Sequence, residues 1–113
     1  MIRRIFVAGL ALALLAVPAS AETCKASYYG AAHHGRKTAS GERFNMHALT
    51  AAHRSYRFGT MLRVTYRGKS VTVRVNDRGP ASWTGRCLDL SEGAARALGM
   101  IRAGVGTVTI QKH

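Results

Sequence analysis

Acidic residues are scarce in this sequence. Only five Asp and Glu stand against 17 Lys and Arg among 113 residues, which gives a formal net charge of +12 at pH 7. So basic a chain is expected to meet a polyanion, and a cell-wall polymer, an anionic membrane surface and a nucleic acid all qualify. Because the basic residues are scattered, charge alone selects no partner, and a cationic surface with no dedicated ligand is the alternative.

Several common catalytic patterns are also missing. The sequence contains no Gly-x-Ser-x-Gly nucleophile elbow and no phosphate-binding loop. Its five histidines show none of the helix or hairpin spacings that zinc ligands have. We therefore expect neither a metal ion nor a cofactor.

One apolar run occurs near the start of the chain. Residues 1–21 are typical of an export signal, with a charged start, an apolar stretch and a small-x-small cleavage site, which are Arg3 and Arg4, residues 5–17 and residues 19–21. The apolar stretch is short for a membrane span, and an uncleaved anchor is the alternative. We expect a periplasmic or secreted protein whose mature part, residues 22–113, forms one domain.

Cysteine is rare as well, with two residues, Cys24 and Cys87. The residues just before Cys24 lack the small apolar side chains of a lipidation site, so no stable membrane anchor is expected. In an oxidising compartment an even pair of cysteines most simply forms one disulfide. Closing so long a loop is worth about 4 kcal/mol in the chain-entropy model. A metal site that uses both cysteines is the competing hypothesis.

Alternating apolar residues bounded by turn signals predict about six short strands. They cover residues 23–29, 49–53, 60–66, 69–76, 86–90 and 104–112. Ser91 is placed to cap a helix over residues 92–98 that Gly99 ends, and residues 45–48 fit one further helical turn. These elements favour a small, mainly β barrel or sandwich with one or two short helices.

Few carboxylates are candidates for chemistry. Glu22 begins the mature chain, and Glu92 lies in the first turn of the predicted helix, where a negative charge favours the helix dipole. Asp89 alternates with leucines, and a structural role is favoured for it. Glu42 and Asp77 remain, and each could instead cap its turn or pair with a neighbouring arginine. A pair of carboxylates is the usual equipment for cleaving glycosidic bonds.

Other side chains could assist such chemistry. His53 precedes a turn and could hydrogen-bond a catalytic carboxylate or a sugar, or could be a structural histidine. Tyr28, Tyr29 and Trp83 could form a stacking platform for sugar rings. Ordinary core packing is the alternative for these aromatic residues.

Four stretches resemble one known family in order and spacing. Together they span about residues 26–110, and they read ASYYG, HHGRKTASGERFNMHALTAAH, FGTMLRVTYRGKSVTVRVNDRGP and LDLSEGAARALGM. They resemble the rare lipoprotein A (RlpA)-like proteins. The resemblance implies a double-psi β-barrel, in which six strands are related by a pseudo-twofold axis.

The resemblance also implies an activity. Characterised members of that family are endolytic lytic transglycosylases that cleave peptidoglycan between N-acetylmuramic acid and N-acetylglucosamine and close an anhydro ring. The implied partner is therefore a peptidoglycan glycan strand and not a nucleic acid. The protein itself is expected to be a monomer. Such a reaction needs an acid at the glycosidic oxygen and then a base for the hydroxyl of the muramic acid.

The family motifs assign roles to individual residues. The acidic residue of the GERF motif falls on Glu42, the histidine of TAAH on His53, and the aspartate of NDRGP on Asp77. The resemblance implies that Asp77 and Glu42 are the catalytic carboxylates and that His53 orients them. We expect Asp77 to be the acid and base with Glu42 assisting, and the surroundings of the two carboxylates decide which of them is the acid. Asn76 and Arg78 flank Asp77 and are expected to contact the substrate.

Two features depart from the family pattern. Many relatives are lipoproteins with a further glycan-binding domain, and neither a lipidation site nor a second domain is expected here. Cys24 and Cys87 do not belong to the common pattern either. The same barrel resembles expansin and barwin-type domains, so a non-catalytic module that binds cell-wall glycans is the alternative function.

Overall fold

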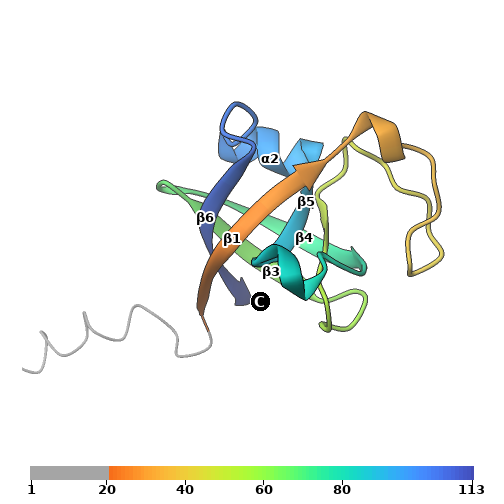
Figure 1. Cartoon of the computed structure of the whole chain (residues 1–113), viewed down its shortest axis with the longest axis horizontal. Coiled ribbons are helices and arrows are strands. Elements are labelled where there is room, and N and C mark those ends of the chain that lie inside the picture. The colour runs from red at the N-terminus through yellow and green to blue at the C-terminus, as the bar shows by residue number, and fades with distance from the viewer. Residues whose placement is uncertain (1–20) are drawn as a thin grey trace, which may run out of the picture.

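Six strands close into a barrel in the order β1-β5-β2-β4-β3-β6 (Figure 1). The computed structural model describes residues 21–113, so the predicted export signal, up to residue 20, lies outside the described residues. The strands are β1 (Glu22–Tyr29), β2 (Thr50–Ala52), β3 (Met61–Tyr66), β4 (Lys69–Asp77), β5 (Arg86–Ser91) and β6 (Val105–Lys112). Each overlaps a predicted strand, and the mainly β class is confirmed.

The pairing of the strands has an internal symmetry. β1 runs parallel to β5 and β2 runs parallel to β4, whereas the other four neighbouring pairs are antiparallel. Exchanging β1 with β4, β2 with β5 and β3 with β6 leaves every pair and its direction unchanged. This is the pseudo-twofold arrangement expected of a double-psi barrel, and it brings the ends of β1 and β4 to related positions.

The barrel is filled by the apolar residues of its alternating strands. Val73 and Val75 of β4 and Leu88 and Leu90 of β5 are fully buried, while the residues between them face outward. Small side chains such as Ala51 fill the remaining space on the short strand β2. Alternation therefore decides which residues of β4 and β5 can reach a substrate.

One α-helix, α2 (Glu92–Leu98), packs against β1, β4 and β5 (Figure 1). The predicted cap is confirmed, because the Ser91 hydroxyl accepts a hydrogen bond from the amide of Ala94 at 3.2 Å. Gly99 ends the helix with a left-handed φ of 73°, which glycine adopts without strain. No helix among the described residues is long and apolar enough to cross a membrane.

The other helical prediction was wrong. Residues 45–48 form a hydrogen-bonded turn, in which the Ala48 amide donates to the Asn45 carbonyl at 3.1 Å. The Asn45 side chain accepts from the His47 amide, a local contact that competes with helix formation. Short 3-10 helices occur elsewhere, at η2 (Ala31–His33) and η3 (Ser82–Thr84).

A bulge interrupts the parallel pair of β2 and β4. Ala51 lies opposite Val75 and Ala52 lies opposite Asp77, so Asn76 is an extra residue. Asn76 is buried. A bulge shifts the alternation by one residue and re-aims the side chains that follow it. Asp77 consequently points out of the barrel, although it is an even number of residues from Val75.

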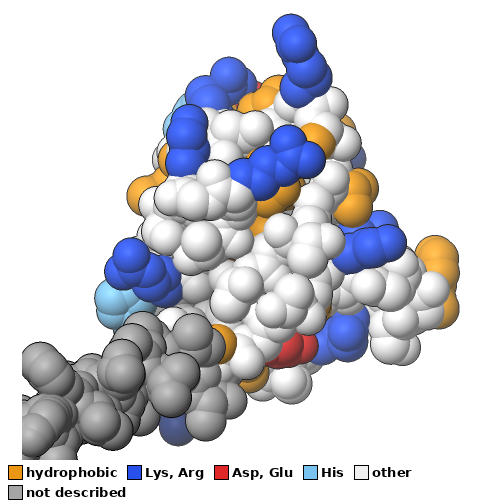
Figure 2. All heavy atoms as spheres, turned by 90° about the vertical axis from the view of Figure 1, so that its left-hand side faces the viewer, with side chains coloured by type: hydrophobic (Ala, Val, Ile, Leu, Met, Phe, Trp, Pro, Cys, Tyr) orange, Lys and Arg blue, Asp and Glu red, His pale blue; other side chains and the backbone are white. Residues whose placement is uncertain are grey.

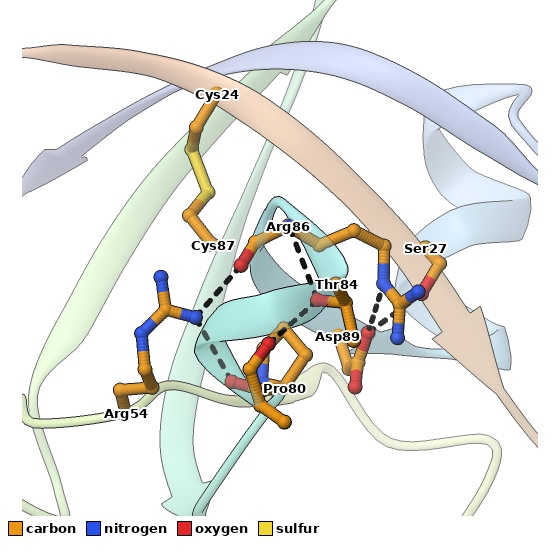
Figure 3. A network of polar contacts seen from close by, with 9 residues as sticks. Cys24, Ser27, Arg54, Pro80, Thr84, Arg86, Cys87 and Asp89 are labelled. Atoms are coloured by element: carbon orange, nitrogen blue, oxygen red, sulfur yellow. Dashed lines mark hydrogen bonds and ion pairs between the residues drawn. A yellow bond between two sulfur atoms is a disulfide. The ribbon is translucent and has the colours of Figure 1, made fainter.

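Cys24 and Cys87 form a disulfide between β1 and β5 (Figure 3). The predicted pairing is therefore confirmed. Cys87 is the extra residue of a second irregularity, because Lys25 lies opposite Arg86 and Ala26 lies opposite Leu88. The disulfide thus joins two parallel strands at the place where their hydrogen-bonding register shifts.

Replacing both cysteines with serine is expected to lower the free energy of unfolding by about 4 kcal/mol. The physical reason is that the disulfide closes a loop with a sequence separation of 63 residues and so restricts the unfolded chain. Denaturant unfolding of the oxidised protein and of the double variant measures the difference. The reduced wild type should behave like the variant, and equal unfolding midpoints for the oxidised and reduced protein would contradict the prediction.

Candidate active site

Asp77 is the last residue of β4, and hydrogen-bond donors from three segments of the chain hold its carboxylate. Oδ1 accepts the backbone N–H groups of Ala39 and Arg78, both at 2.9 Å. Oδ2 accepts the phenol of Tyr29 at 3.3 Å. The residue is half-buried, so the carboxylate is oriented by the protein and still reaches solvent. Such an oriented and accessible carboxylate is suited to proton transfer.

A loop of residues 38–42 lies along the end of β4. The Ala39 amide binds Asp77, and the Ser40 amide donates to the Asn76 carbonyl at 3.3 Å. The loop turns back on itself because both the amide and the hydroxyl of Thr38 donate to the Glu42 carbonyl at 2.8 Å. The predicted turn before Glu42 is therefore present, and it delivers that carboxylate to the same strand as Asp77.

Glu42 is paired with an arginine. The Arg74 guanidinium donates to Oε1 at 2.6 Å and to Oε2 at 3.0 Å. These hydrogen bonds lower the pKa of Glu42, the charge of Arg74 and the Asn76 side chain act in the same direction, and partial burial opposes them. Arg74 lies three residues before Asp77, about 10 Å along an extended strand. Glu42 therefore stays ionised and neutralised beside Asp77, and it is poorly suited to donate a proton.

His53 forms the turn beside β4 and does not touch the Asp77 carboxylate. Its Nδ1 accepts the amides of Ser55 and Tyr56 at 3.1 and 3.0 Å, and its ring stacks on the Tyr56 ring at 3.7 Å. Burial is the largest of the effects that lower the pKa of His53. The neutral ring with an accepting Nδ1 carries its proton on Nε2. His53 reaches Asp77 through the backbone, where its amide donates to the Asp77 carbonyl at 3.2 Å.

Arg78 and Asn76 lie on either side of Asp77 in different surroundings. The Arg78 guanidinium donates to the Tyr56 carbonyl at 2.8 Å and lies over the Phe58 ring at 4.0 Å. It is exposed, so its remaining donors face solvent. Asn76 is buried, and its Oδ1 has no hydrogen-bond partner within the described part of the chain. Arg78 is therefore accessible to a ligand, whereas Asn76 supports the site from beneath.

The three aromatic candidates do not form one platform. Tyr28 and Tyr29 alternate on β1, and the Tyr28 phenol donates to the Ile101 carbonyl at 3.0 Å, beyond α2. The Tyr29 ring instead stacks on Phe44 with centroids 4.4 Å apart. Trp83 lies in η3, and 87% of its surface is exposed. The structure thus brings Tyr29 to Asp77 but leaves Tyr28 and Trp83 without a contact to it.

Asp89 is a second carboxylate near Asp77 that sequence reasoning set aside. Ala52 of β2 pairs with Asp77 on one side and with Asp89 on the other. Two strand spacings separate the two aspartates, which is about 10 Å between their Cα atoms. Asp89 Oδ1 accepts the Ser27 hydroxyl at 2.6 Å and Nε of Arg86 at 3.3 Å (Figure 3). Only the pairing of β2 with both β4 and β5 reveals this proximity.

The segment that follows Asp77 is tied down by Arg54. The Arg54 guanidinium donates to the carbonyls of Pro80 and Arg86 at 2.9 and 2.8 Å (Figure 3). These two bonds fix both ends of the loop that carries Trp83. No enclosed pocket occurs among residues 21–113. On the face seen in Figure 2, Lys and Arg side chains are spread out, with backbone, uncharged polar side chains and some hydrophobic side chains between them.

The sequence of the chain matches a known protein family. Residues 21–110 match the family model described as lytic transglycolase. The chain belongs to this family. It is 59% identical over 87 residues to a probable endolytic peptidoglycan transglycosylase RlpA of Synechocystis sp.. It is 47% identical over 93 residues to the endolytic peptidoglycan transglycosylase RlpA of Neisseria meningitidis serogroup A.

These matches cover most of this chain and a smaller part of each relative. They span 75% of this chain and 27% of the Synechocystis protein, and 80% of this chain and 38% of the Neisseria protein. This chain therefore spans well under half of the length of either relative. Membership of the family is shown by the shared domain.

Solved structures confirm the barrel. A Streptomyces papain inhibitor matches with a TM-score of 0.68 and 23% identity, over 85% of this chain and 97% of its own. The apo expansin of Clavibacter michiganensis matches with a TM-score of 0.65 and 27% identity, over 82% of this chain and 50% of its own. The likeness to the papain inhibitor shows the fold alone, and the double-psi β-barrel expected from the sequence is confirmed.

Replacing Arg74 with glutamine is expected to destabilise the protein by less than about 1 kcal/mol at neutral pH, since both partners of the ion pair are about two-fifths exposed. The pKa of Glu42 is lowered in the folded state, so the pair contributes stability above the ordinary value of 4.5 and loses it as the pH falls through the lowered pKa. Urea unfolding of wild type and variant at neutral and acid pH measures the difference. If the difference in unfolding free energy between wild type and variant grew at acid pH, the lowered pKa of Glu42 would be contradicted.

Proposed function

We propose that this chain is a lytic transglycosylase domain that cleaves peptidoglycan glycan strands between N-acetylmuramic acid and N-acetylglucosamine. The observation that carries the proposal is the Asp77 carboxylate, which is oriented by three donors and reaches solvent in a chain of the lytic transglycolase family. The names of the two relatives described above point to the same substrate.

The proposed reaction uses Asp77 twice. The protonated carboxyl group first gives its proton to the glycosidic oxygen as the bond from C1 of the muramic acid breaks. The carboxylate then takes the proton from the C6 hydroxyl of the same sugar, whose oxygen attacks C1 and closes the anhydro ring. Protons balance over the cycle and no water is consumed, so a single carboxylate with access to both oxygens is sufficient.

Neighbouring residues have supporting parts in this proposal. Glu42, ionised and paired with Arg74, assists Asp77 through the loop of residues 38–42, whose Ala39 amide donates to the Asp77 carboxylate. Arg78 binds polar groups of the glycan from its exposed position. His53 and Asn76 act indirectly, because His53 shapes the turn that supports Arg78 and Asn76 forms the bulge that orients Asp77.

We also propose that the domain, residues 22–113, acts outside the cytoplasm, in the periplasm or as a secreted protein, as a monomer without a stable membrane anchor. The disulfide of Cys24 and Cys87 supports this, since disulfides persist in oxidising compartments. The export pattern of residues 1–21 and a cell-wall substrate point in the same direction.

Glycan binding without cleavage is the second candidate. Two observations favour it: the exposure of Trp83, whose face is available to a sugar ring, and the likeness to an expansin at 27% identity. In that case Asp77 would contact the glycan as a hydrogen-bond acceptor. The two functions differ in whether anhydro-ended products accumulate.

Asp77→Asn is expected to abolish the release of anhydro-ended products, a loss of at least about a hundredfold, because an amide neither donates nor removes the proton. Mass spectrometry of purified sacculi incubated with the protein measures the release. Glu92→Gln is the matched control, since Glu92 lies on α2 and pairs with Arg96. It should retain the wild-type rate.

Two results would count against the transglycosylase proposal. One is an intact glycan after incubation with the wild type while the protein sediments with the sacculi, which favours the binding module. The other is release by Asp77→Asn at the wild-type rate, which would remove Asp77 from the reaction.

Trp83→Ala is expected to weaken binding to sacculi about fivefold, because one stacked aromatic ring contributes about 1 kcal/mol. Co-sedimentation with sacculi over a range of protein concentrations measures the affinity. Exposure of the indole means that the thermal midpoint should stay at the wild-type value. Unchanged affinity would show that Trp83 does not contact the glycan.

A further inference from the structure

The phenol of Tyr29 reaches Asp77 from a different strand of the barrel. Tyr29 is the last residue of β1 and Asp77 is the last residue of β4. The Tyr29 hydroxyl lies 3.3 Å from Oδ2 of Asp77. We propose that Tyr29 is a positioning residue, whose hydroxyl sets the orientation of Asp77 Oδ2 for proton transfer. This inference rests on the lytic transglycosylase function proposed above, and it assigns Tyr29 a role other than sugar stacking.

The two oxygens of Asp77 are held differently. Oδ1 accepts two backbone N–H groups, from Ala39 and Arg78, and backbone donors of this kind stay in place during a reaction. Oδ2 accepts only the Tyr29 hydroxyl among the described residues. Oδ2 is therefore the oxygen free to exchange a proton, and Tyr29 is the side chain that controls the direction in which it points.

Tyr29 is itself held rigidly enough to position another group. Its ring stacks on Phe44 with an interplanar angle of 16°, and the His33 ring meets it edge-on with centroids 5.4 Å apart. Phe44 is buried, and its backbone is paired with the amide of Gly35 at 2.9 Å and with the carbonyl of Arg36 at 2.7 Å. Because Phe44 covers one face of the Tyr29 ring, that face is unavailable to a sugar.

The surroundings also keep the Tyr29 hydroxyl protonated. Burial raises the pKa of Tyr29 most, and the negative charge of Asp77, the hydrogen bond to it and the charge of Asp89 raise it further. With its pKa raised, the phenol is a hydrogen-bond donor to Asp77 and does not compete with it as a base. Its contribution is a hydrogen bond of fixed direction.

Tyr29→Phe separates positioning from stacking, because phenylalanine keeps the ring against Phe44 and removes the hydroxyl. We expect kcat for anhydro-product release to fall about tenfold, the worth of a hydrogen bond to a charged group, with KM within about twofold. Tyr66→Phe is the matched control: Tyr66 lies on β3 within the core, and its loss of a hydroxyl should leave both constants unchanged. An unchanged kcat for Tyr29→Phe, or a raised KM with unchanged kcat, would overturn the inference.

A substrate-free measurement keeps the inference separate from the proposed function. Carbon-13 NMR of the tyrosine Cζ atoms follows phenol ionisation as the pH rises, in the wild type and in Asp77→Asn. The neutral asparagine removes the charge that disfavours the phenolate, so Tyr29 should ionise at lower pH in the variant. An unchanged titration would overturn the contact. The wild type could instead release no anhydro product while the Tyr29 titration still changes in Asp77→Asn. That result would refute the proposed function and retain the contact between Tyr29 and Asp77.

Discussion

The hydrogen bonds to the Asp77 carboxylate are the constraint on which the candidate site depends. They join the end of β4 to the end of β1 through Tyr29 and to the loop of residues 38–42 through the Ala39 amide. Together with the Ser40 amide, which donates to the Asn76 carbonyl, they hold that loop along β4, where Glu42 reaches Arg74. One accessible carboxylate thus organises its surroundings and is in turn oriented by them, which is the usual condition for a group that must transfer a proton in a defined direction.

The ion pair with Arg74 gives Glu42 surroundings different from those of Asp77. A bidentate arginine keeps Glu42 ionised, whereas the partners of the Asp77 carboxylate include no arginine side chain among the described residues. Two carboxylates in different surroundings can serve one site in different ways. Asp89 is a third carboxylate, on the other side of Ala52 from Asp77. Its charge raises the pKa of Tyr29, and it forms an ion pair with Arg86.

Much of the fold could be predicted because it depends on local patterns. The alternation of Val71, Val73 and Val75 indicated β4, Ser91 and Gly99 marked the limits of α2, and two cysteines indicated one disulfide. Two predictions failed for local reasons. The Asn45 side chain accepts the His47 amide and competes with the helical turn predicted for residues 45–48, and Tyr28 and Tyr29 face opposite ways because they are neighbours on one strand.

The sequence by itself determined the strands, the helix limits and the cysteine pair, and its family motifs singled out Asp77 as a candidate site residue. The tertiary structure alone decided which residues accompany it. Glu42 binds Arg74, the His53 ring faces its own turn, and the Tyr29 hydroxyl meets Asp77 across 48 residues of sequence. The physical reason is that these contacts depend on the closure of the barrel and on the bulge at Asn76, both of which follow from pairing between distant strands and leave no local signal.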